Sequence, residues 1–238
     1  HCFDAAIEAV RIALTFRTPV ILMSDGYLAN GTEPWKLPEM TDYAAIDVNF
    51  TTEPNQTDAD GNPVYWPYLR DENLIRPLAI PGTPGLMHRI GGLEKQDGSG
   101  NVSYDPANHS KMVHLRAERI AHIAKFIPPV EVMGDADADV LVLGWGSTWA
   151  AIDAAVQRTR RRGLKVAWVH LTHLNPLPPN LGEVLRRYPR LIVPELNLGQ
   201  LCRLVRSEYL VDAKPVSKVQ GLPFTAIEIE NAIEGALQ

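Results

Sequence analysis

The sequence predicts an α/β fold, and the run from Asp139 to Thr148 is the strongest sign of it. Residues 140–143, Val-Leu-Val-Leu, show no polar alternation and read as a strand buried on both faces, which is typical of a parallel sheet. Gly144 and Gly146 then turn the chain into a helix-forming stretch. Further apolar runs of strand length alternate with helical patterns up to the C-terminus, as in doubly wound sheets.

Composition and charge exclude several classes of partner. The formal net charge is -5 over 238 residues, and basic residues form no stripe, so a nucleic-acid partner is not expected. No apolar stretch reaches the roughly 18 residues that span a bilayer, so we expect no membrane contact and a soluble, cytoplasmic protein. Cys2 and Cys202 are too far apart to suggest a local metal site, and we expect reduced thiols.

The first 32 residues predict a helix followed by one strand. Phe3, Ile7, Val10 and Leu14 keep the spacing of a buried helical face, and Pro19 ends the helix. Residues 20–24 read as a buried strand. One strand makes no sheet, so these elements either join the C-terminal sheet or, as we favour, are the last piece of a nucleotide-type domain whose earlier strands precede residue 1. The chain would then be a C-terminal fragment.

An irregular region follows, and then one long helix. Prolines and turn clusters exclude long helices over residues 31–104, while many apolar side chains argue for an ordered arm that packs against something. Asp105-Pro106 supplies an N-cap and a proline at the first helical position, and we expect a helix to about Phe126. Its histidines, His109, His114 and His122, lack metal-ligand spacing and are expected to be solvated.

The C-terminal part predicts a small doubly wound domain. Helices are expected over residues 148–162, 180–187 and 199–210, and strands over 164–169, 191–193 and 216–219. The four arginines among residues 158–162 suit a solvated helix end, where the helix dipole is negative. Thr225 and Glu228 have the spacing of a capping box that opens a last helix.

Ligands of such sheets collect at the carboxyl ends of the strands, so the loops at residues 144–147, 170–173 and 195–198 are the candidate site. Gly144, Gly146 and Ser147 are candidates for cofactor binding, because free N–H groups at a helix start favour an anion. The third glycine of a dinucleotide fingerprint is missing, however, and a tight turn without a ligand is the alternative.

His170, His173 and Glu195 could act as acid and base at the same edge of the sheet. No nucleophile accompanies them, so we assign no catalytic residue, and we assign no metal ligand.

Several motifs in this order resemble the C-terminal part of the alpha subunit of 2-oxoacid:ferredoxin oxidoreductases, most closely the 2-oxoglutarate type. The resemblance covers essentially the whole chain. It rests on the following motifs: Pro19-Val-Ile-Leu-Met-Ser-Asp-Gly-Tyr-Leu-Ala29, Pro81-Gly-Thr-Pro-Gly85, Gly92-Leu-Glu94, Asp105-Pro-Ala-Asn-His109, Gly144-Trp-Gly-Ser-Thr148, Pro194-Glu-Leu-Asn-Leu-Gly199 and Gly221-Leu-Pro-Phe224.

The resemblance implies three parts and a reaction. Residues 1–32 would end a domain of the type that holds the pyrimidine of thiamine diphosphate, 33–127 would be an irregular arm and connecting helix, and 128–238 a transketolase C-terminal-like domain. The family decarboxylates a 2-oxoacid oxidatively with thiamine diphosphate, reduces ferredoxin and forms an acyl-coenzyme A.

The resemblance also implies how the subunits share this work. The substrate-binding and thiamine-activating residues would lie before His1. The beta subunit would hold the diphosphate, its Mg²⁺ and the iron–sulfur cluster, which two distant cysteines could not bind. We therefore expect a beta subunit and possible second alpha subunit as partners, ferredoxin reached through the complex, no cofactor bound by this chain alone, and an inactive isolated chain.

Two departures from the family pattern limit what carries over. Ser24-Asp25-Gly26 replaces the Gly-Asp-Gly that starts a thiamine diphosphate metal motif, so a turn is expected there. The loop that starts at Glu94 lacks the His-Asp-Glu type sequence that relatives often show after Gly-Leu-Glu. The alternatives are a pyruvate-type or branched-chain member, an α/β module that binds a nucleotide or coenzyme A without catalysis, and a structural interaction subunit.

Overall fold

The computed structural model describes all residues from 1 to 238, and they form two compact units. The first unit consists of His1–Leu22 and Trp35–Ile123, and the second of Met23–Pro34 and Ala124–Gln238. No helix in either unit is long and apolar enough to cross a bilayer.

A five-stranded sheet organises the second unit, and the predicted parallel α/β class is confirmed. The strand order is β3-β5-β4-β6-β7, and every neighbouring pair is parallel except β3 with β5. Residues 140–143 of the central strand are at most 1% exposed, because both faces of the sheet are covered. The strands are β3 (Met133–Gly134), β4 (Val140–Trp145), β5 (Val166–Leu171), β6 (Leu191–Glu195) and β7 (Ala213–Ser217).

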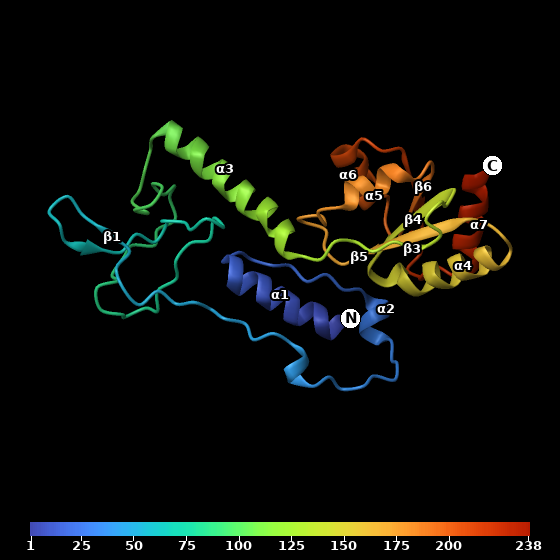
Figure 1. Ribbon diagram of the computed structural model, residues 1–238, viewed down its shortest axis with the longest axis horizontal. Helices are drawn as coiled ribbons and strands as arrows, with labels where there is room; N and C mark the ends of the chain where they lie inside the picture. Colours follow the sequence, from blue (N-terminus) through green and yellow to red (C-terminus); the bar gives the residue numbers. More distant parts are fainter. The chain divides into compact units, whose positions relative to one another are not determined.

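Two helices cover each face of this sheet (Figure 1). Apolar side chains of α4 and α7 pack on one face, and those of α5 and α6 pack on the other. The apolar face of each helix has the 3.6-residue period that a surface helix needs. The helices are α4 (Trp149–Arg161), preceded by a 3-10 turn (Gly146–Thr148), α5 (Leu181–Arg187), α6 (Gln200–Tyr209) and α7 (Ala226–Leu237).

The edges of the sheet differ from the sequence prediction. Strand β7 begins at Ala213, three residues before the predicted strand, and includes Pro215. A proline cannot donate to a ladder and is confined to edge strands, which is the position of β7. The two-residue β3 has no detectable pattern and was not predicted.

The capping box of α7 is confirmed. Thr225 N donates to Glu228 Oε2 over 2.7 Å, and Glu228 N donates to Thr225 Oγ1 over 3.4 Å. The Nζ of Lys218 lies 2.8 Å from both carboxylate oxygens of Glu228. These bonds fix the start of α7 beside the end of β7.

Residues 20–24 do not form the predicted strand. They pair with no other strand, and the Ile21 side chain is 86% exposed. An apolar run becomes a strand only where a neighbour satisfies its backbone groups, and none is present here. The segment leads into α2 (Gly26–Asn30) in the second unit.

Helix α1 (Cys2–Phe16) opens the first unit as predicted, but it buries another face. Ile12 and Phe16 are its buried residues, whereas Phe3 and Val10 are exposed. Apolar residues lie on more than one side of this helix, so their spacing alone does not select the buried side.

The irregular region from residue 31 to 104 is confirmed. Its regular elements are a 3-10 turn (Met40–Asp42) and the antiparallel pair β1 (Gln56–Thr57) and β2 (Pro63–Val64). Gly98 and Gly100 have φ near +75°, and a Cβ would lie 2.9 Å from the Trp66 ring and 2.7 Å from the Tyr68 ring, respectively. These close approaches order the region without long helices or strands.

Helix α3 (Pro106–His122) follows, with the predicted N-cap. Asp105 Oδ1 accepts from Ala107 N over 3.0 Å, and Pro106 occupies the first helical position. A 3-10 turn (Ile123–Phe126) continues it to the predicted end.

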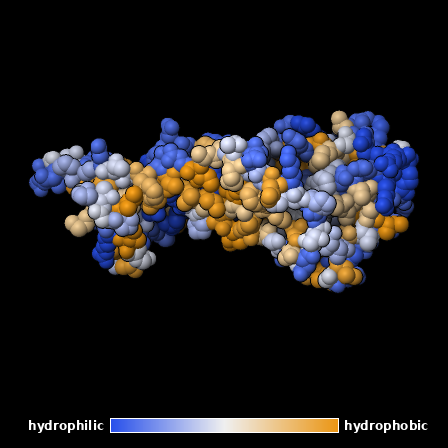
Figure 2. Space-filling model, turned by 90° about the horizontal axis from the view of Figure 1, so that it is seen from below, coloured by the Kyte–Doolittle hydropathy of each residue, from blue (hydrophilic) through white to orange (hydrophobic).

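The surface carries many large apolar side chains (Figure 2). Scattered apolar residues are normal on a monomer, whereas a contiguous apolar patch marks a surface that another molecule covers. Exposed residues of this kind follow one another over residues 20–40, namely Val20, Ile21, Leu22, Met23, Tyr27, Leu28, Trp35, Leu37 and Met40.

Replacing Gly144 by alanine should destabilise the second unit. A Cβ there would lie 2.4 Å from Ile152 Cδ1, and Ile152 is fully buried, so the added methyl overpacks the interface between β4 and α4. We expect a loss of about 1–3 kcal/mol in urea unfolding. In the control Gly235→Ala, where a Cβ meets nothing within 4 Å in α7, stability should stay equal or rise by up to about 1 kcal/mol. Equal effects of the two variants would contradict this account.

The cap of α7 should make the stability of the protein depend on pH in the acid range. Hydrogen bonds from Lys218 and Thr225 lower the pKa of Glu228 to about 2. A depressed pKa in the folded state gives stability that is present above the ordinary value of 4.5 and is lost as the pH falls through about 2. Glu228→Gln should therefore melt below the wild type at pH 7, and the gap should narrow from pH 4.5 to 2. A gap that does not change with pH would argue against this ionised cap.

Candidate functional site

The carboxyl edge of the sheet brings together the loops that the sequence singled out. Strands β5 and β6 lie on either side of β4, so the loops after Trp145, Leu171 and Glu195 leave from the same edge. Helix α4, which connects β4 to β5, packs on one face of the sheet, and helix α6, which connects β6 to β7, packs on the other. This is the switch point of a doubly wound sheet, where ligands of this fold class bind.

The glycine turn after β4 is held by Thr148. Its Oγ1 donates to Trp145 O over 2.8 Å and accepts from Trp145 N over 3.2 Å. Gly144 is needed for packing, because an added Cβ would lie 2.4 Å from Ile152 Cδ1 and 3.1 Å from Thr148 Oγ1. Gly146 has φ +59° with no heavy atom within 4 Å of a Cβ, so the turn is open on that side. The contact of Gly144, Gly146 and Ser147 with a cofactor stays a prediction.

His170 lies beside this turn, at the end of β5. Its Nδ1 would lie 3.4 Å from a Cβ on Gly144, and this nitrogen is buried without a hydrogen-bond partner. Burial lowers the pKa of His170 to about 4. The imidazole is therefore neutral at physiological pH and cannot serve there as a protonated general acid.

The Glu195 side chain has a structural role. It is fully buried, and its two carboxylate oxygens accept from Leu201 N over 2.8 Å and from Cys202 N over 2.9 Å. A carboxylate at a helix start satisfies free N–H groups and suits the dipole. Burial, and then the charge of Glu195, raises the pKa of the Cys202 thiol, so this buried cysteine is unreactive.

These positions do not support an acid–base set of His170, His173 and Glu195. No hydrogen bond joins Glu195 to His170, and Nδ1 of His173 lies 3.0 Å from Thr172 Oγ1. Glu195 acts instead as an internal cap of α6.

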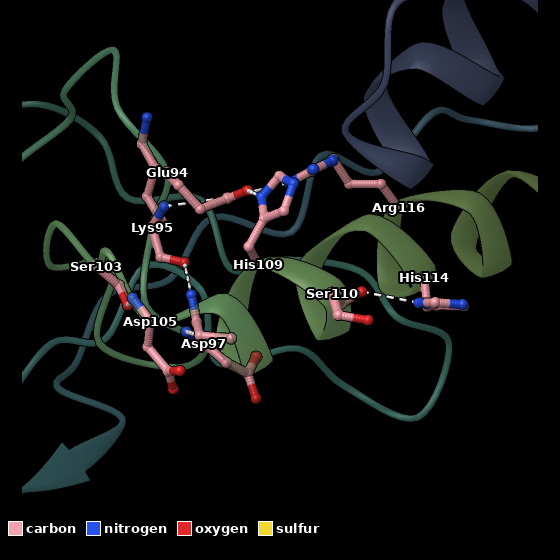
Figure 3. Close-up of polar contacts among 10 residues, drawn as sticks. Glu94, Lys95, Asp97, Ser103, Asp105, His109, Ser110, His114 and Arg116 are labelled. Atoms are coloured by element: carbon pink, nitrogen blue, oxygen red, sulfur yellow. Dashed lines mark hydrogen bonds and ion pairs between the residues drawn. The ribbon is translucent and has the colours of Figure 1, made fainter.

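In the first unit, the structure joins two residues that sequence reasoning left apart. Glu94 Oε2 accepts from Nδ1 of His109 over 2.7 Å, and Glu94 Oε1 accepts from Arg116 Nη1 over 3.3 Å (Figure 3). Since a carboxylate only accepts, Nδ1 of His109 must carry the hydrogen. These bonds, from His109 first and then from Arg116, lower the pKa of Glu94.

Side chains of α3 also bond to the loop of residues 94–103 and extend this contact. Asn108 Nδ2 donates to Lys95 O over 2.8 Å, Asn108 Oδ1 accepts from Asp97 N over 3.0 Å, and Lys111 pairs with Asp97 at 2.5 Å. The loop thus lies along the first two turns of α3. The Glu94 side chain is 20% exposed and that of His109 64%, which fits a loop anchor with one open imidazole edge. Nothing in the sequence signals this pairing, because it depends on the path of the loop.

The remaining histidines and cysteines of the chain form no metal site. Nδ1 of His114 bonds to Ser110 O over 2.8 Å, and Nε2 of His122 bonds to Asn73 Oδ1 over 3.0 Å. No group of three histidine, cysteine or acidic side chains could hold a metal ion.

Asp25 is the N-cap of α2, where the sequence predicted a turn at the end of a strand. Its Oδ1 accepts from Leu28 N over 2.9 Å at the start of α2. The Asp25 carboxylate is thus engaged at a helix start, and we assign no residue of this chain to the metal ion or the diphosphate of thiamine diphosphate.

Two family models match the chain. The model described as "Pyruvate flavodoxin/ferredoxin oxidoreductase, thiamine diP-bdg" matches residues 1–102. The model described as "Pyruvate:ferredoxin oxidoreductase core domain II" matches residues 138–232, which contain strands β4 to β7. The boundaries expected at residues 32 and 127 stay a prediction.

Known proteins are similar over nearly the whole chain. The 2-oxoglutarate oxidoreductase subunit KorA of Mycobacterium tuberculosis is 52% identical over 99% of this chain. The alpha subunit of 2-oxoacid:ferredoxin oxidoreductase 1 of Aeropyrum pernix is 32% identical over 100% of it. A solved structure of 2-oxoglutarate:ferredoxin oxidoreductase from Magnetococcus marinus, with 2-oxoglutarate, coenzyme A and succinyl-CoA bound, matches all of the chain with a TM-score of 0.88 and 32% identity.

The chain spans only part of these proteins, namely 35% and 36% of the two relatives and 40% of the solved chain. Both family models, the relatives and the solved structure nevertheless agree with the family resemblance described above. The chain belongs to the family of 2-oxoacid:ferredoxin oxidoreductase alpha subunits.

Proposed function

We propose that this chain is the C-terminal part of the alpha subunit of a thiamine-diphosphate-dependent 2-oxoglutarate:ferredoxin oxidoreductase. The observation that carries the proposal is the 52% identity, over 99% of the chain, with a subunit named for 2-oxoglutarate. The solved relative with 2-oxoglutarate, coenzyme A and succinyl-CoA bound supports the same substrate.

The proposed reaction breaks the bond between the carboxylate and keto carbons of 2-oxoglutarate and releases CO₂. The acyl carbon is oxidised and forms a thioester with the sulfur of coenzyme A, and two electrons leave one at a time to two ferredoxins. Thiamine diphosphate, when bound, stabilises the carbanion that decarboxylation leaves. We propose that the contribution of this chain is to shape and cover the site.

The exposed apolar surface supports a subunit interface. Nine large apolar side chains between residues 20 and 40 are exposed, and leaving them in water is unfavourable. In the proposed enzyme they pack against the beta subunit or a second alpha subunit, and electrons reach ferredoxin through that complex. Without these partners, the isolated chain is inactive.

The proposal places the remaining cofactors outside this chain. Asp25 is occupied as a cap, and the two cysteines, one exposed and one buried, cannot supply the four thiolates of an iron–sulfur cluster. We propose that the beta subunit holds the Mg²⁺, the diphosphate and the cluster. A cytoplasmic location, where thiols stay reduced, is part of the same proposal.

Reconstitution of the full-length alpha subunit with its genomic beta neighbour tests the reaction. We expect viologen or ferredoxin reduction that requires 2-oxoglutarate, coenzyme A and thiamine diphosphate, with little reduction when pyruvate replaces 2-oxoglutarate. Preference for pyruvate or a branched-chain 2-oxoacid would correct the substrate but keep the family. No reduction with any 2-oxoacid would refute the proposal, and tight calorimetric binding of coenzyme A by the isolated chain would then favour a binding module.

A substitution in the open glycine turn tests whether the carboxyl edge of the sheet contacts a cofactor. If Gly146 and Ser147 contact a bound cofactor in the assembled enzyme, Ser147→Ala should lower turnover or raise the cofactor concentration needed for half-maximal rate by about tenfold, the effect of roughly one lost hydrogen bond to a charged group. The control Ser207→Ala, at an exposed position of α6, should change neither quantity. Unchanged kinetics for both variants would leave the turn with a packing role only.

A further inference from the structure

Four arginines of the first unit gather around one point. Arg17 ends α1, Arg70 and Arg76 lie in the irregular region, and Arg119 lies on α3; all four are half-buried. Arg119 Nη1 donates to Arg17 O over 3.1 Å. The positive charges of Arg119 and Arg76 act on Arg70, and the charge of Arg76 also acts on Arg119. We call these four residues the arginine cluster.

The cluster has no carboxylate partner. None of its guanidinium groups forms an ion pair, and their bonds go to backbone carbonyls, as from Arg17 to Leu14 O and from Arg70 to Leu74 O. The Nε atoms of Arg17, Arg70 and Arg119 are buried without any hydrogen-bond partner. Burying three charged donors without partners lowers the stability of the fold. An acceptor that binds these guanidinium groups would offset that loss.

Burial disfavours the charged form of three of these arginines, and neighbouring positive charges add to this effect at two of them. Burial lowers the pKa of Arg17, Arg70 and Arg119, and the positive neighbours lower the pKa of Arg70 and Arg119 further. Arginine still remains protonated at neutral pH. The charges persist, so the fold tolerates a repulsion that an anion would relieve.

A cavity opens beside the cluster. It has a volume of about 250 Å³ and is lined by Arg17 and Arg76, together with Thr15, Asn49, Asp47 and Asp71. The two carboxylates serve turns: Asp47 Oδ1 accepts from Asn49 N over 2.9 Å, and Asp71 Oδ1 accepts from Ile75 N over 2.8 Å. Asp97 also acts on Arg70, so four guanidinium groups face three carboxylates and positive charge is in excess.

The backbone around the cavity is unusual as well. Arg17, Asn49 and Leu74 have φ of 52°, 48° and 62°, and they are three of the four non-glycine residues with positive φ in the chain. Arg17 and Asn49 line the cavity, and Leu74 precedes its lining residue Ile75. Such conformations are concentrated at binding sites, where the surrounding structure holds them.

We propose that this cavity binds a phosphate group, either free or carried by a nucleotide, with Arg17 and Arg76 as its direct ligands and Arg70 and Arg119 supplying further positive charge. The guanidinium fork matches phosphate oxygens in pairs. A phosphate group, which carries about 1.5 to 2 negative charges at neutral pH, suits a cavity with an excess of positive charge. Its test measures binding and does not depend on turnover.

Calorimetric titration of the full chain with sodium phosphate and, separately, with ADP tests the site at low ionic strength. Wild-type protein should bind at least one of them with 1:1 stoichiometry. Arg76→Gln should weaken binding at least tenfold, and Arg76→Lys, which keeps the charge but loses the fork, should weaken it by a smaller factor. Arg76 is the position to change because its guanidinium lies over the Tyr68 ring, 4.4 Å from the centroid, and forms no bond that holds the fold together.

The control is Arg89→Gln, which removes the same charge from an exposed position of the same unit. It should bind like the wild type, and circular dichroism should show equal melting of all variants. Tighter binding of ADP than of phosphate would assign the site to nucleotides, and equal binding would assign it to the phosphate group alone. No binding of either ligand, or equal weakening by Arg76→Gln and Arg89→Gln, would overturn the proposal.

Discussion

The burial of β4 on both faces is the constraint on which the second unit depends. Val140, Leu141, Val142 and Leu143 alternate between the two faces, and each is at most 1% exposed. Helices must therefore cover both faces, so the chain crosses the sheet after β5 and creates a switch point beside β4. Gly144 then lets α4 approach the end of the strand, and Glu195 anchors α6 to the end of β6.

The first unit is held in another way. It has few regular elements, and its order comes from side chains that close over turns, such as Trp66 against Gly98 and Glu94 against His109. Such a structure buries little apolar surface of its own, which agrees with the exposed Ile21, Trp35 and Leu37 of this unit. A unit of this kind suits a subunit that is completed by its neighbours.

Sequence reasoning succeeded where a local signal decides the structure. The unbroken apolar run of β4, the proline after Asp105 and the box of Thr225 with Glu228 each determine an element through nearby residues. It failed where the outcome depends on a distant partner. Residues 20–24 look like a strand but have nothing to pair with, and the side of α1 that is buried depends on what packs against it.

The same division applies to the candidate sites. The glycine turn could be found from the sequence, because it follows directly from a strand signal. The roles of Glu195 as a cap and of Glu94 as an anchor could not, since each side chain bonds to groups whose position depends on the path of the loop. The arginine cluster assembles residues that are up to 102 positions apart, so no local motif marks it.

In the proposed function, the chain serves an enzyme that converts 2-oxoglutarate to a thioester of coenzyme A. Mass spectrometry of the coenzyme A products, made by the reconstituted alpha–beta enzyme with oxidised ferredoxin, tests it most directly. The account predicts succinyl-CoA, with one molecule formed for every two ferredoxins reduced. Ferredoxin reduction without any coenzyme A thioester, or no product from any 2-oxoacid, would contradict it.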